Sequence, residues 1–295
     1  LHYNTRMSSK PRFTRIAVAT HPHLEEVQAE AESIVAFLEA RGVDATRGML
    51  DDDALEQKIA AGAFDLVITL GGDGMMLRTG HLCAPYGVPI LGINMGSLGF
   101  LMEIQGPQWR QSLPRLLEGD YWFESRMMLR AEQRRDGVSL GAWEVMNEAM
   151  VGRGEIMRPV RITAEVDGLY LTTYVADGLI AATPTGSTAY ALAAGGPILP
   201  PELRNILLVP VAPHLSVDRA IVLAEGSCVV ITAHTTHKAA LSVDGQPPIP
   251  LEDGDQVDIR ASKHTASFVR LQDPGYFYRN LTSRMNKNFV TGGPL

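Results

Sequence analysis

Phe64-Asp-Leu-Val-Ile-Thr-Leu-Gly-Gly-Asp-Gly74 is the stretch of sequence that decides the fold. Phe64 to Leu70 is a mostly apolar run of the kind that is buried on both faces of a parallel sheet, so we expect a strand. The glycines that follow allow a sharp turn, and the spacing of Met75 to Cys83 predicts a helix. A buried strand, a Gly-rich loop and a helix in this order are typical of α/β proteins.

Strands and helices alternate on both sides of this stretch. Upstream, Arg15 to Thr20 is a short β-branched run, and apolar residues from Leu24 to Leu38 recur at helical spacing until Gly42. The remaining elements that we expect are helices at Ala54 to Ala61 and Trp109 to Glu118 and a strand at Pro89 to Asn94. The pattern predicts a doubly wound, Rossmann-like α/β domain over residues 1–120.

After about Tyr121 the pattern changes to short β runs. The runs that we interpret as strands are 126–135, 140–146, 161–166, 169–175, 207–211, 220–223, 228–232, 239–243, 256–261 and 266–271. Asp167-Gly168 and Asp244-Gly245 are turn signals between such runs. We expect a β-rich, sandwich-like domain over 121–275 and a C-terminal segment, 276–295, that is helical at 281–289 and returns to the N-terminal domain. Small ligands are expected in a cleft between the two halves.

The composition excludes several classes of protein. The 33 acidic and 26 basic residues give a net charge of -7, which argues against a broad nucleic-acid-binding face but leaves local phosphate sites open. The 45% hydrophobic and 20% charged residues exclude a disordered or fibrous chain.

The two cysteines, Cys83 and Cys228, cannot form a disulfide framework, and this low cysteine content fits a protein of the reducing cytoplasm. No apolar run reaches the length of a membrane span. Residues 1–12 are interpreted as a frayed tail, with Met7 as a candidate start.

Several common signatures are missing from the sequence. The sequence has no Gly-Lys dipeptide, no G-x-G-x-x-G loop after a strand and no G-x-S-x-G elbow. These absences argue against a Walker A nucleotide-binding protein, a dinucleotide-binding protein with the Rossmann fingerprint and an α/β-hydrolase. His234 and His237 are three apart in a β region and therefore point to opposite faces, which favours surface roles over a metal site.

Gly71-Gly72-Asp73-Gly74 carries the first chemical signal. Glycines allow close approach of the backbone to a phosphate, whose charge is favoured at the N-terminus of the following helix. A carboxylate in such a loop is costly unless it accepts a proton, binds a cation or contacts a hydroxyl group, so Asp73 indicates chemistry on a hydroxyl substrate. A surface Asp-Gly turn is the alternative, and these four residues alone do not separate the two.

Thr183-Pro-Thr-Gly-Ser-Thr-Ala-Tyr190 carries the second signal, in a block that runs on to Pro197. We expect its hydroxyl groups to cap a helix over Thr188 to Ala194 and its small residues to admit a ligand. A structural cap needs one hydroxyl group and this block has four, with Tyr190 as a stacking face, which favours a ligand site.

Taken together, these motifs resemble those of bacterial NAD kinases. The resemblance rests on GGDG at 71–74, Asn94-Met-Gly-Ser-Leu-Gly-Phe-Leu101, Asn147-Glu148, the run from Asp177 to Pro197 and Ser242-Val-Asp-Gly-Gln246. GGDG alone is shared with lipid kinases and 6-phosphofructokinases, whereas the long second block is specific. The resemblance implies transfer of the γ-phosphoryl group of ATP to the 2′-hydroxyl of the adenosine ribose of NAD.

The resemblance also implies roles for single residues. Asp73 is then the proton acceptor, Gly71, Gly72 and Gly74 form the phosphate loop, and Asn147 and Glu148 hold the ribose and adenine. Further contacts to the dinucleotide fall on Gly74, Arg78, Arg158, Val175, Asp177, Thr188, Ala189, Tyr190, Ala191, Leu192, Ala193, Ala212 and Gln246. For Arg78 and Arg158 a solvated surface charge is the alternative. Many relatives carry Arg or Lys where this chain has Val175, which leaves the choice of phosphoryl donor, ATP alone or also polyphosphate, open.

Cofactors and partners follow from the same resemblance. A divalent ion, Mg²⁺ before others, is expected on the donor phosphates, with no protein-built metal cage. The partners are small nucleotides rather than nucleic acid or membrane, in a cytoplasmic homo-oligomer, dimer or tetramer. The alternatives are a diacylglycerol- or sphingosine-type lipid kinase, whose Thr-x-Asn-Asp type segment we do not find, and a non-catalytic dinucleotide sensor, against which the intact Asp73 argues.

Overall fold

The computed structural model of the chain describes residues 13–21, 25–96, 99–154, 158–214, 218–235 and 237–285. The interpreted tail at 1–12 and residues 286–289 of the expected last helix lie outside this part. The chain divides into two compact units: unit 1 extends to Glu124 and resumes at Ser267, and unit 2 is Ser125–Ala266. Residues 267–275, which the sequence pattern placed in the β-rich domain, belong to unit 1. The cleft expected between the two halves stays a prediction.

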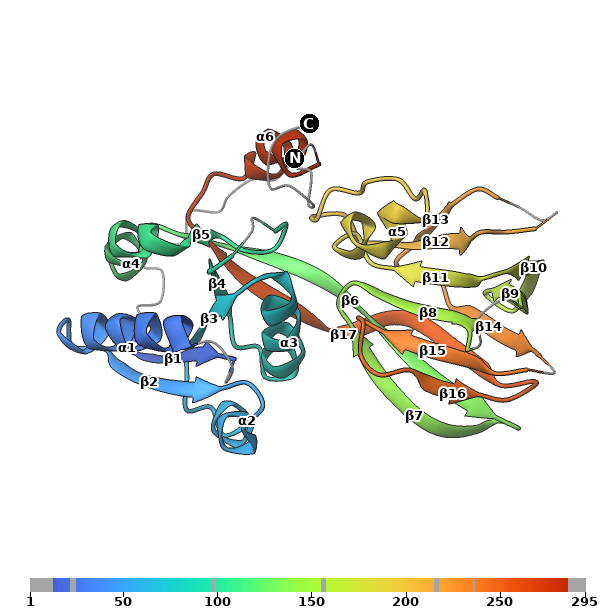
Figure 1. Cartoon of the computed structure of the whole chain (residues 1–295), viewed down its shortest axis with the longest axis horizontal. Helices are drawn as coiled ribbons and strands as arrows, with labels where there is room; N and C mark the ends of the chain where they lie inside the picture. Colours follow the sequence, from blue (N-terminus) through green and yellow to red (C-terminus); the bar gives the residue numbers. More distant parts are fainter. Residues whose placement is uncertain are drawn as a thin grey trace. The chain divides into compact units, whose positions relative to one another are not determined.

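Unit 1 alternates strands and helices as the sequence predicts (Figure 1). Its elements are β1 (Arg15–Thr20), α1 (Glu25–Glu39), β2 (Asp44–Met49), α2 (Asp53–Ala60), β3 (Leu66–Gly71), α3 (Asp73–Cys83), η1 (Ala84–Tyr86), β4 (Ile90–Asn94), β5 (Ile104–Gln105), η2 (Gly106–Gln108), α4 (Trp109–Leu117) and, after unit 2, α6 (Tyr276–Met285). The parallel strands lie in the order β4-β3-β1-β2, and β5 pairs with β4.

Helices cover both faces of this parallel sheet. Buried residues of α1 and α4 pack with Ile68, Leu70 and Ile93 in one cluster. On the opposite face, a β-carbon added to Gly92 would lie 3.0 Å from the sulfur of Met76, so α3 packs there. The doubly wound prediction is therefore confirmed, and the strand order reverses between β1 and β3, where α/β sheets bind ligands beyond the carboxyl ends of the strands.

Unit 2 is built almost entirely of strands. They are β6 (Trp122–Arg135), which begins in unit 1, then β7 (Val138–Val145), β8 (Glu148–Arg153), β9 (Val160–Val166), β10 (Leu169–Ala176), β11 (Gly178–Ala182), β12 (Asn205–Val211), β13 (Ile221–Ala224), β14 (Val229–His234), β15 (Ala239–Val243), β16 (Ile249–Leu251) and β17 (Gln256–Arg270), which ends in unit 1. Between β11 and β12 come the short helices η3 (Gly186–Thr188) and α5 (Tyr190–Ala193).

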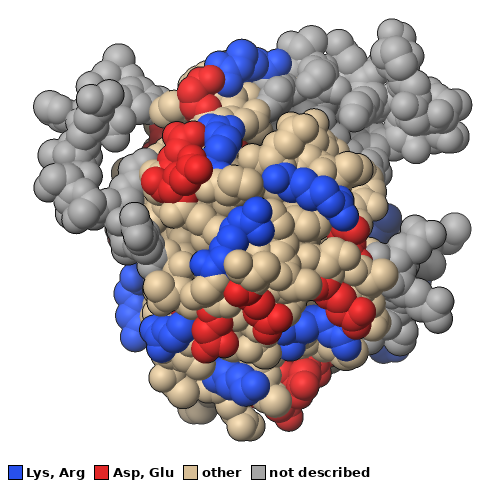
Figure 2. All heavy atoms as spheres, turned by 90° about the vertical axis from the view of Figure 1, so that its left-hand side faces the viewer, with Lys and Arg blue, Asp and Glu red and all other residues tan. Residues whose placement is uncertain are grey.

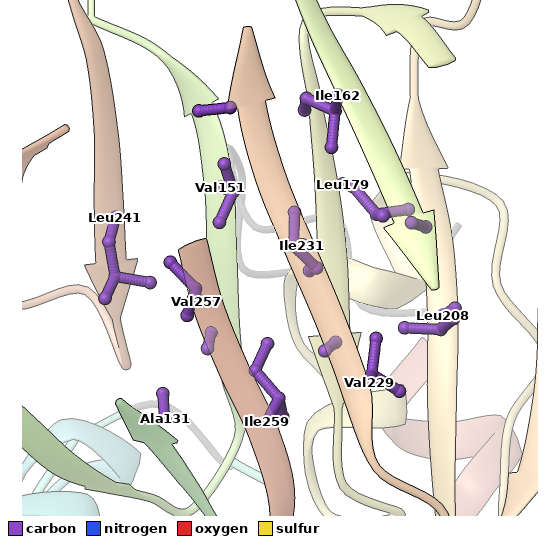
Figure 3. Packing of buried hydrophobic residues seen from close by; sticks show 14 of the residues in the cluster. Ala131, Val151, Ile162, Leu179, Leu208, Val229, Ile231, Leu241, Val257 and Ile259 are labelled. Atoms are coloured by element: carbon purple, nitrogen blue, oxygen red, sulfur yellow. The ribbon is translucent and has the colours of Figure 1, made fainter. Parts of the chain in front are cut away.

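Two sheets face each other in unit 2. One has the order β13-β12-β11-β8-β15-β16, and the other contains β10-β9-β14-β17. Alternate residues of both sheets point into a common core (Figure 3), with Val151, Leu179 and Leu241 from the first sheet and Ile162 and Ile231 from the second. This period-two burial is that of a β-sandwich, which confirms the predicted sandwich-like class.

Some of the expected elements differ in the structure. The strands predicted at 256–261 and 266–271 are one strand, β17, because the polar residues between them include neither Gly nor Pro and occupy a partly exposed face. The helix predicted over Thr188–Ala194 is shorter in the structure: α5 covers only Tyr190–Ala193, and it is separated from η3 at Ala189, whose φ is -101° and ψ is -129°. The last helix begins at Tyr276, five residues before the predicted position.

Four strands, β2, β5, β8 and β16, lacked a sequence signal strong enough to predict them. β2 is a polar strand that pairs only with β1, at the edge of its sheet, where one face meets solvent. β5 and β16 are only two and three residues long, and β8 begins directly at Glu148, a residue that we assigned to ligand binding rather than to a strand.

Charges of both signs are mixed on the face of the molecule that Figure 2 draws. Ion pairs in unit 1 include Arg47 with Glu32 at 2.7 Å and Arg110 with Glu30 at 3.0 Å. In the part of the chain that the structure describes, no helix has the length and apolar character needed to cross a membrane.

Candidate functional site

The GGDG turn joins β3 to α3 in unit 1. Gly71 has φ +152°, and a β-carbon there would lie 2.4 Å from Cγ of Met75, so packing and backbone both demand glycine. Gly72 and Gly74 differ, because a β-carbon at either would meet nothing within 4 Å. A glycine within a helix costs about 1 kcal/mol relative to alanine, and no packing contact among the described residues explains that cost at Gly74. Open space beside these two residues is what close approach of a phosphate requires.

Asp73, the first residue of α3, has a fixed carboxylate. Its Oδ2 accepts a hydrogen bond from the backbone N–H of Phe100 at 2.7 Å, and its Oδ1 accepts one from Leu101 at 3.0 Å. Two amides from one loop hold the plane of the carboxylate, while each oxygen retains a second lone pair for another donor. GGDG and the motif that begins at Asn94 therefore meet at this carboxylate, a contact that the sequence did not reveal.

Arg78 lies on the same helix and is half exposed. Its Nη1 is 2.8 Å from Oδ1 of Asp51, and Nε2 of His21 is 3.9 Å from Oδ2 of the same carboxylate. An exposed pair of this kind contributes only about 0–1 kcal/mol, so Arg78 can exchange Asp51 for a phosphate at little cost.

Asn147 and Glu148 in unit 2 present unsatisfied acceptors. Oδ1 of Asn147 and Oε2 of Glu148 are buried and have no hydrogen-bond partner among the residues that the structure describes. Burial raises the pKa of the Glu148 carboxyl to about 8; the nearby charge of Asp244 adds to the rise, and a hydrogen bond from the backbone of Tyr190 opposes it. A buried acceptor left unpaired costs roughly 1–3 kcal/mol. Two such atoms on adjacent residues are what a ligand with hydrogen-bond donors would satisfy.

The backbone around this pair is tightly held. Asn147 O accepts from the backbone N–H of Thr183 at 2.9 Å. A β-carbon on Gly186 would lie 2.1 Å from the same oxygen, so only glycine fits there. The carboxylate of Asp244 accepts from the amides of Met146, Asn147 and Glu148.

The four hydroxyl groups of the second block do not cap a helix, so the expected cap is wrong. Thr183 Oγ1 donates to Met146 O and accepts from Gly186 N, and Ser187 Oγ donates to Pro184 O and accepts from Leu199 N. Thr185 accepts from the buried Arg126, and Thr188 donates to Thr185 O. These hydroxyl groups instead form hydrogen bonds within the segment and tie it to Arg126, Met146 and Leu199. The side chain of Tyr190 is 44% exposed, as a stacking face requires.

A second group of predicted residues meets where β10, β11 and β12 end or begin. Asp177 pairs with Arg153 at 3.0 Å, and its backbone N–H donates to Val211 O. Val175 O accepts from the N–H of His214 at 2.7 Å, just after Ala212, a non-glycine residue with φ +45°. The structure thus brings Val175, Asp177 and Ala212 together. Arg153 was not predicted.

The remaining predicted residues have simpler surroundings. Gln246 is exposed in the turn after β15, two residues beyond Asp244. Nη1 of Arg158 is 2.7 Å from Nε2 of His237, and no contact of Arg158 with the other predicted residues is found in the described part of the chain. Within the same part, no group of three or more His, Cys, Asp or Glu residues has the arrangement of a metal site.

Comparison with known families covers most of the chain. The ATP-NAD kinase N-terminal domain model matches residues 16–121, which include GGDG, and the ATP-NAD kinase C-terminal domain model matches residues 146–271, which include the Asn-Glu pair. The chain belongs to the ATP-NAD kinase family. Both parts of the candidate site therefore fall inside the matched domains.

Two relatives, both named NAD kinase, match over most of their lengths. The NAD kinase of Chloroflexus aggregans is 38% identical over 274 residues, 93% of this chain and 99% of that protein. The NAD kinase of Heliobacterium modesticaldum is 42% identical over 224 residues, 76% of this chain and 79% of that protein.

Solved structures show the same fold. Yeast NADH kinase complexed with NADH superposes with a TM-score of 0.83 at 23% identity, covering 95% of this chain and 89% of that chain. An NAD kinase from Archaeoglobus fulgidus in complex with ATP superposes with a TM-score of 0.74 at 26% identity, covering 92% and 98%.

Proposed function

We propose that this member of the ATP-NAD kinase family transfers the γ-phosphoryl group of ATP to the 2′-hydroxyl of the adenosine ribose of NAD, giving NADP and ADP. The observation that carries the proposal is the carboxylate of Asp73, fixed by two backbone amides at the N-terminus of α3. Family membership, relatives named NAD kinase and the ATP complex of an archaeal relative support the same activity.

Asp73 would accept the hydroxyl proton. Phosphoryl transfer through a loose transition state depends on positioning and charge neutralisation more than on a strong base, so a carboxylate held in one orientation is sufficient. The amides of the turn at Gly71, Gly72 and Gly74 and the N-terminus of α3 would hold donor phosphate. Arg78 would neutralise phosphate charge after it leaves Asp51.

Asn147 and Glu148 would bind the adenosine half of NAD. Their buried oxygens are acceptors without donors, and the adenine amino group and the ribose hydroxyl groups are donors. Asp177, Ala212, Val175, Gln246, Arg158 and the segment from Thr188 to Ala193 would line the rest of the dinucleotide site.

Mg²⁺ would arrive with the donor nucleotide. Because the described residues supply no cluster of three metal-binding side chains, we propose that nucleotide oxygens and water hold the ion, which would offset charge on the donor phosphates.

We also propose a cytoplasmic homo-oligomer that serves NADP biosynthesis. Exposed apolar side chains at the β6–β7 and β9–β10 hairpins, Val138, Leu140, Leu169 and Tyr170, are candidates for a subunit contact. Light scattering of the purified protein gives the mass: a dimer or tetramer supports the proposal and a monomer contradicts it.

A coupled assay tests the reaction. Purified protein with ATP, Mg²⁺ and NAD should yield NADP that glucose-6-phosphate dehydrogenase reduces, and the same assay with GTP and polyphosphate measures donor breadth. Asp73→Asn should bind NAD but lose most turnover. Folded wild-type protein that forms no NADP, or an Asp73→Asn variant with the wild-type rate, would contradict the proposal.

Two other assays on the same purified protein distinguish the alternative functions from the proposed one. A lipid kinase would phosphorylate diacylglycerol in micelles, and a sensor would bind NAD in calorimetry without transferring phosphate. The family match and the intact Asp73 favour neither.

A further inference from the structure

Asp244 has more contacts than its turn requires. It lies between β15 and β16, with φ +47° and glycine as the next residue. Asp136 and Asp167 have the same geometry, with φ of +49° and +54° and glycine next. Asp136 makes no side-chain hydrogen bond within the described part of the chain, and Asp167 accepts one, from Cys228 N. An Asp-Gly turn therefore forms without a network.

The carboxylate of Asp244 collects three consecutive backbone amides. Oδ2 accepts from Met146 N at 2.6 Å, and Oδ1 accepts from both Asn147 N and Glu148 N at 2.8 Å. The backbone N–H of Asp244 donates in return to Glu148 O at 3.0 Å. Hydrogen bonds to a charged acceptor are stronger than neutral ones, so this is a firm clamp on the backbone between β7 and β8.

The hydrogen bonds of Asp244 satisfy the backbone of Asn147 and Glu148 but not their side chains. The amides of Asn147 and Glu148 are occupied by Asp244, and the carbonyl of Asn147 is occupied by Thr183 N. The oxygens left without donors are on the two side chains, Oδ1 of Asn147 and Oε2 of Glu148. With its amides committed, the local backbone cannot fold back to satisfy these acceptors.

We propose that Asp244 is a positioning residue of the dinucleotide site, which fixes the Asn147–Glu148 pair in its binding orientation without touching the ligand. The proposal rests on the proposed function in that it takes these two residues as the adenosine contacts. Asp244 lies within the Ser242–Gln246 motif, of which only Gln246 was assigned a contact with the dinucleotide, so the proposal adds a role for Asp244.

The test compares Asp244→Asn with Asp136→Asn. Asn tolerates positive φ, so both variants keep their turns. At residue 244, however, the NH₂ group of the new carboxamide replaces a carboxylate oxygen. It then faces at least one of the three backbone amides, and because both groups are hydrogen-bond donors, that hydrogen bond is lost. We expect the KM for NAD and its calorimetric Kd to rise about tenfold in Asp244→Asn, with kcat and the KM for ATP within about twofold of wild type, since one lost charge-assisted hydrogen bond has that size. Asp136→Asn should match wild type.

The pH dependence of NAD affinity distinguishes a positioning role of Asp244 from a general loss of stability in the variant. An ionised Glu148 carboxylate accepts hydrogen bonds from NAD better than the protonated acid, so we expect NAD affinity to rise with pH through the pKa of Glu148. Because the charge of Asp244 contributes to the raised pKa of Glu148, this rise in affinity should move to lower pH in Asp244→Asn. A variant that is merely less stable would keep the wild-type profile.

Hydrogen exchange of the wild-type protein gives an independent result that needs no variant to fold. Without NAD, the amides of Met146, Asn147 and Glu148 should exchange slowly, and rapid exchange of all three would overturn the proposal, as would an unchanged Kd in Asp244→Asn. Calorimetry needs no turnover, so a wild-type protein that binds NAD but forms no NADP refutes the activity and leaves Asp244 testable.

Discussion

Gly99 lies directly against the carboxylate of Asp73: a β-carbon at residue 99 would stand 2.1 Å from Oδ1. The next two amides, those of Phe100 and Leu101, donate to the same carboxylate. The loop after β4 thus approaches the side chain closely enough to hold it, and only a residue without a side chain permits this approach.

Gly99→Ala should displace the Asp73 carboxylate and lower kcat by on the order of 100-fold, because a misplacement of about 1 Å has that cost in catalysis. NAD binding should persist. Gly96→Ala is the matched control on the same loop, since a β-carbon there meets nothing within 4 Å. Steady-state kinetics and NAD calorimetry of both variants check this, and a Gly99→Ala enzyme with wild-type kcat would contradict the assigned role of Asp73.

Arg270 holds the loop after β4 through the carbonyl group of Leu101. It is fully buried and donates to Glu124, Glu103 and Leu101 O, the carbonyl of the residue whose amide holds Asp73. Arg270→Met would leave buried carboxylates without a counter-charge, at a cost of about 3–5 kcal/mol. We expect Tm to fall by roughly 10 °C.

The exposed pair of Arg279 with Asp273 supplies the control for Arg270. Arg279→Met should leave Tm within about 2 °C, because exposed pairs contribute little. Thermal denaturation by circular dichroism measures both variants, and equal shifts would argue against the buried cluster as the anchor.

Glu148→Gln should make the free protein more stable in alkaline solution. The folded pKa of Glu148 is raised to about 8 from 4.5, so the folded state holds its proton more tightly than the unfolded state. Stability therefore falls as pH rises from about 4.5 to about 8, and glutamine removes that loss. We expect Tm of Glu148→Gln to exceed wild type at pH 9 and to equal it at pH 4, with NAD binding weakened. A constant difference in Tm across this range would contradict the pKa assignment.

The fold could be predicted from the sequence wherever hydrophobic spacing is strong. β3 and α1 carry continuous or helical apolar patterns, and both were found within a few residues of their predicted bounds. β2 was not predicted because an edge strand tolerates polar residues. The helix expected from Thr188 starts only at Tyr190, because hydroxyl groups that resemble caps, those of Ser187 and Thr188, donate to nearby backbone carbonyls instead.

The sequence motifs predicted residues of the candidate site but not the contacts that hold them in place. Asp73, Asn147 and Glu148 follow from the motifs, whereas the contacts that hold them join residues 27 and 97 positions apart, Phe100 with Asp73 and Asn147 with Asp244. Pairings across such separations leave no local pattern, and an Asp-Gly turn has the same sequence whether or not its carboxylate binds other amides.

Asp51→Asn should tighten nucleotide binding by removing the competitor for Arg78. The two side chains are about half exposed and 2.8 Å apart, so their pairing adds little stability, and Tm should stay near wild type. If Arg78 binds a phosphate, Arg78→Gln raises KM for that nucleotide several-fold, while Asp51→Asn lowers it. Arg47→Gln, which breaks the exposed pair with Glu32, controls for loss of surface charge. Kinetics with ATP and NAD varied separately identify the nucleotide, and unchanged KM values in both variants would leave Arg78 as a solvated surface charge.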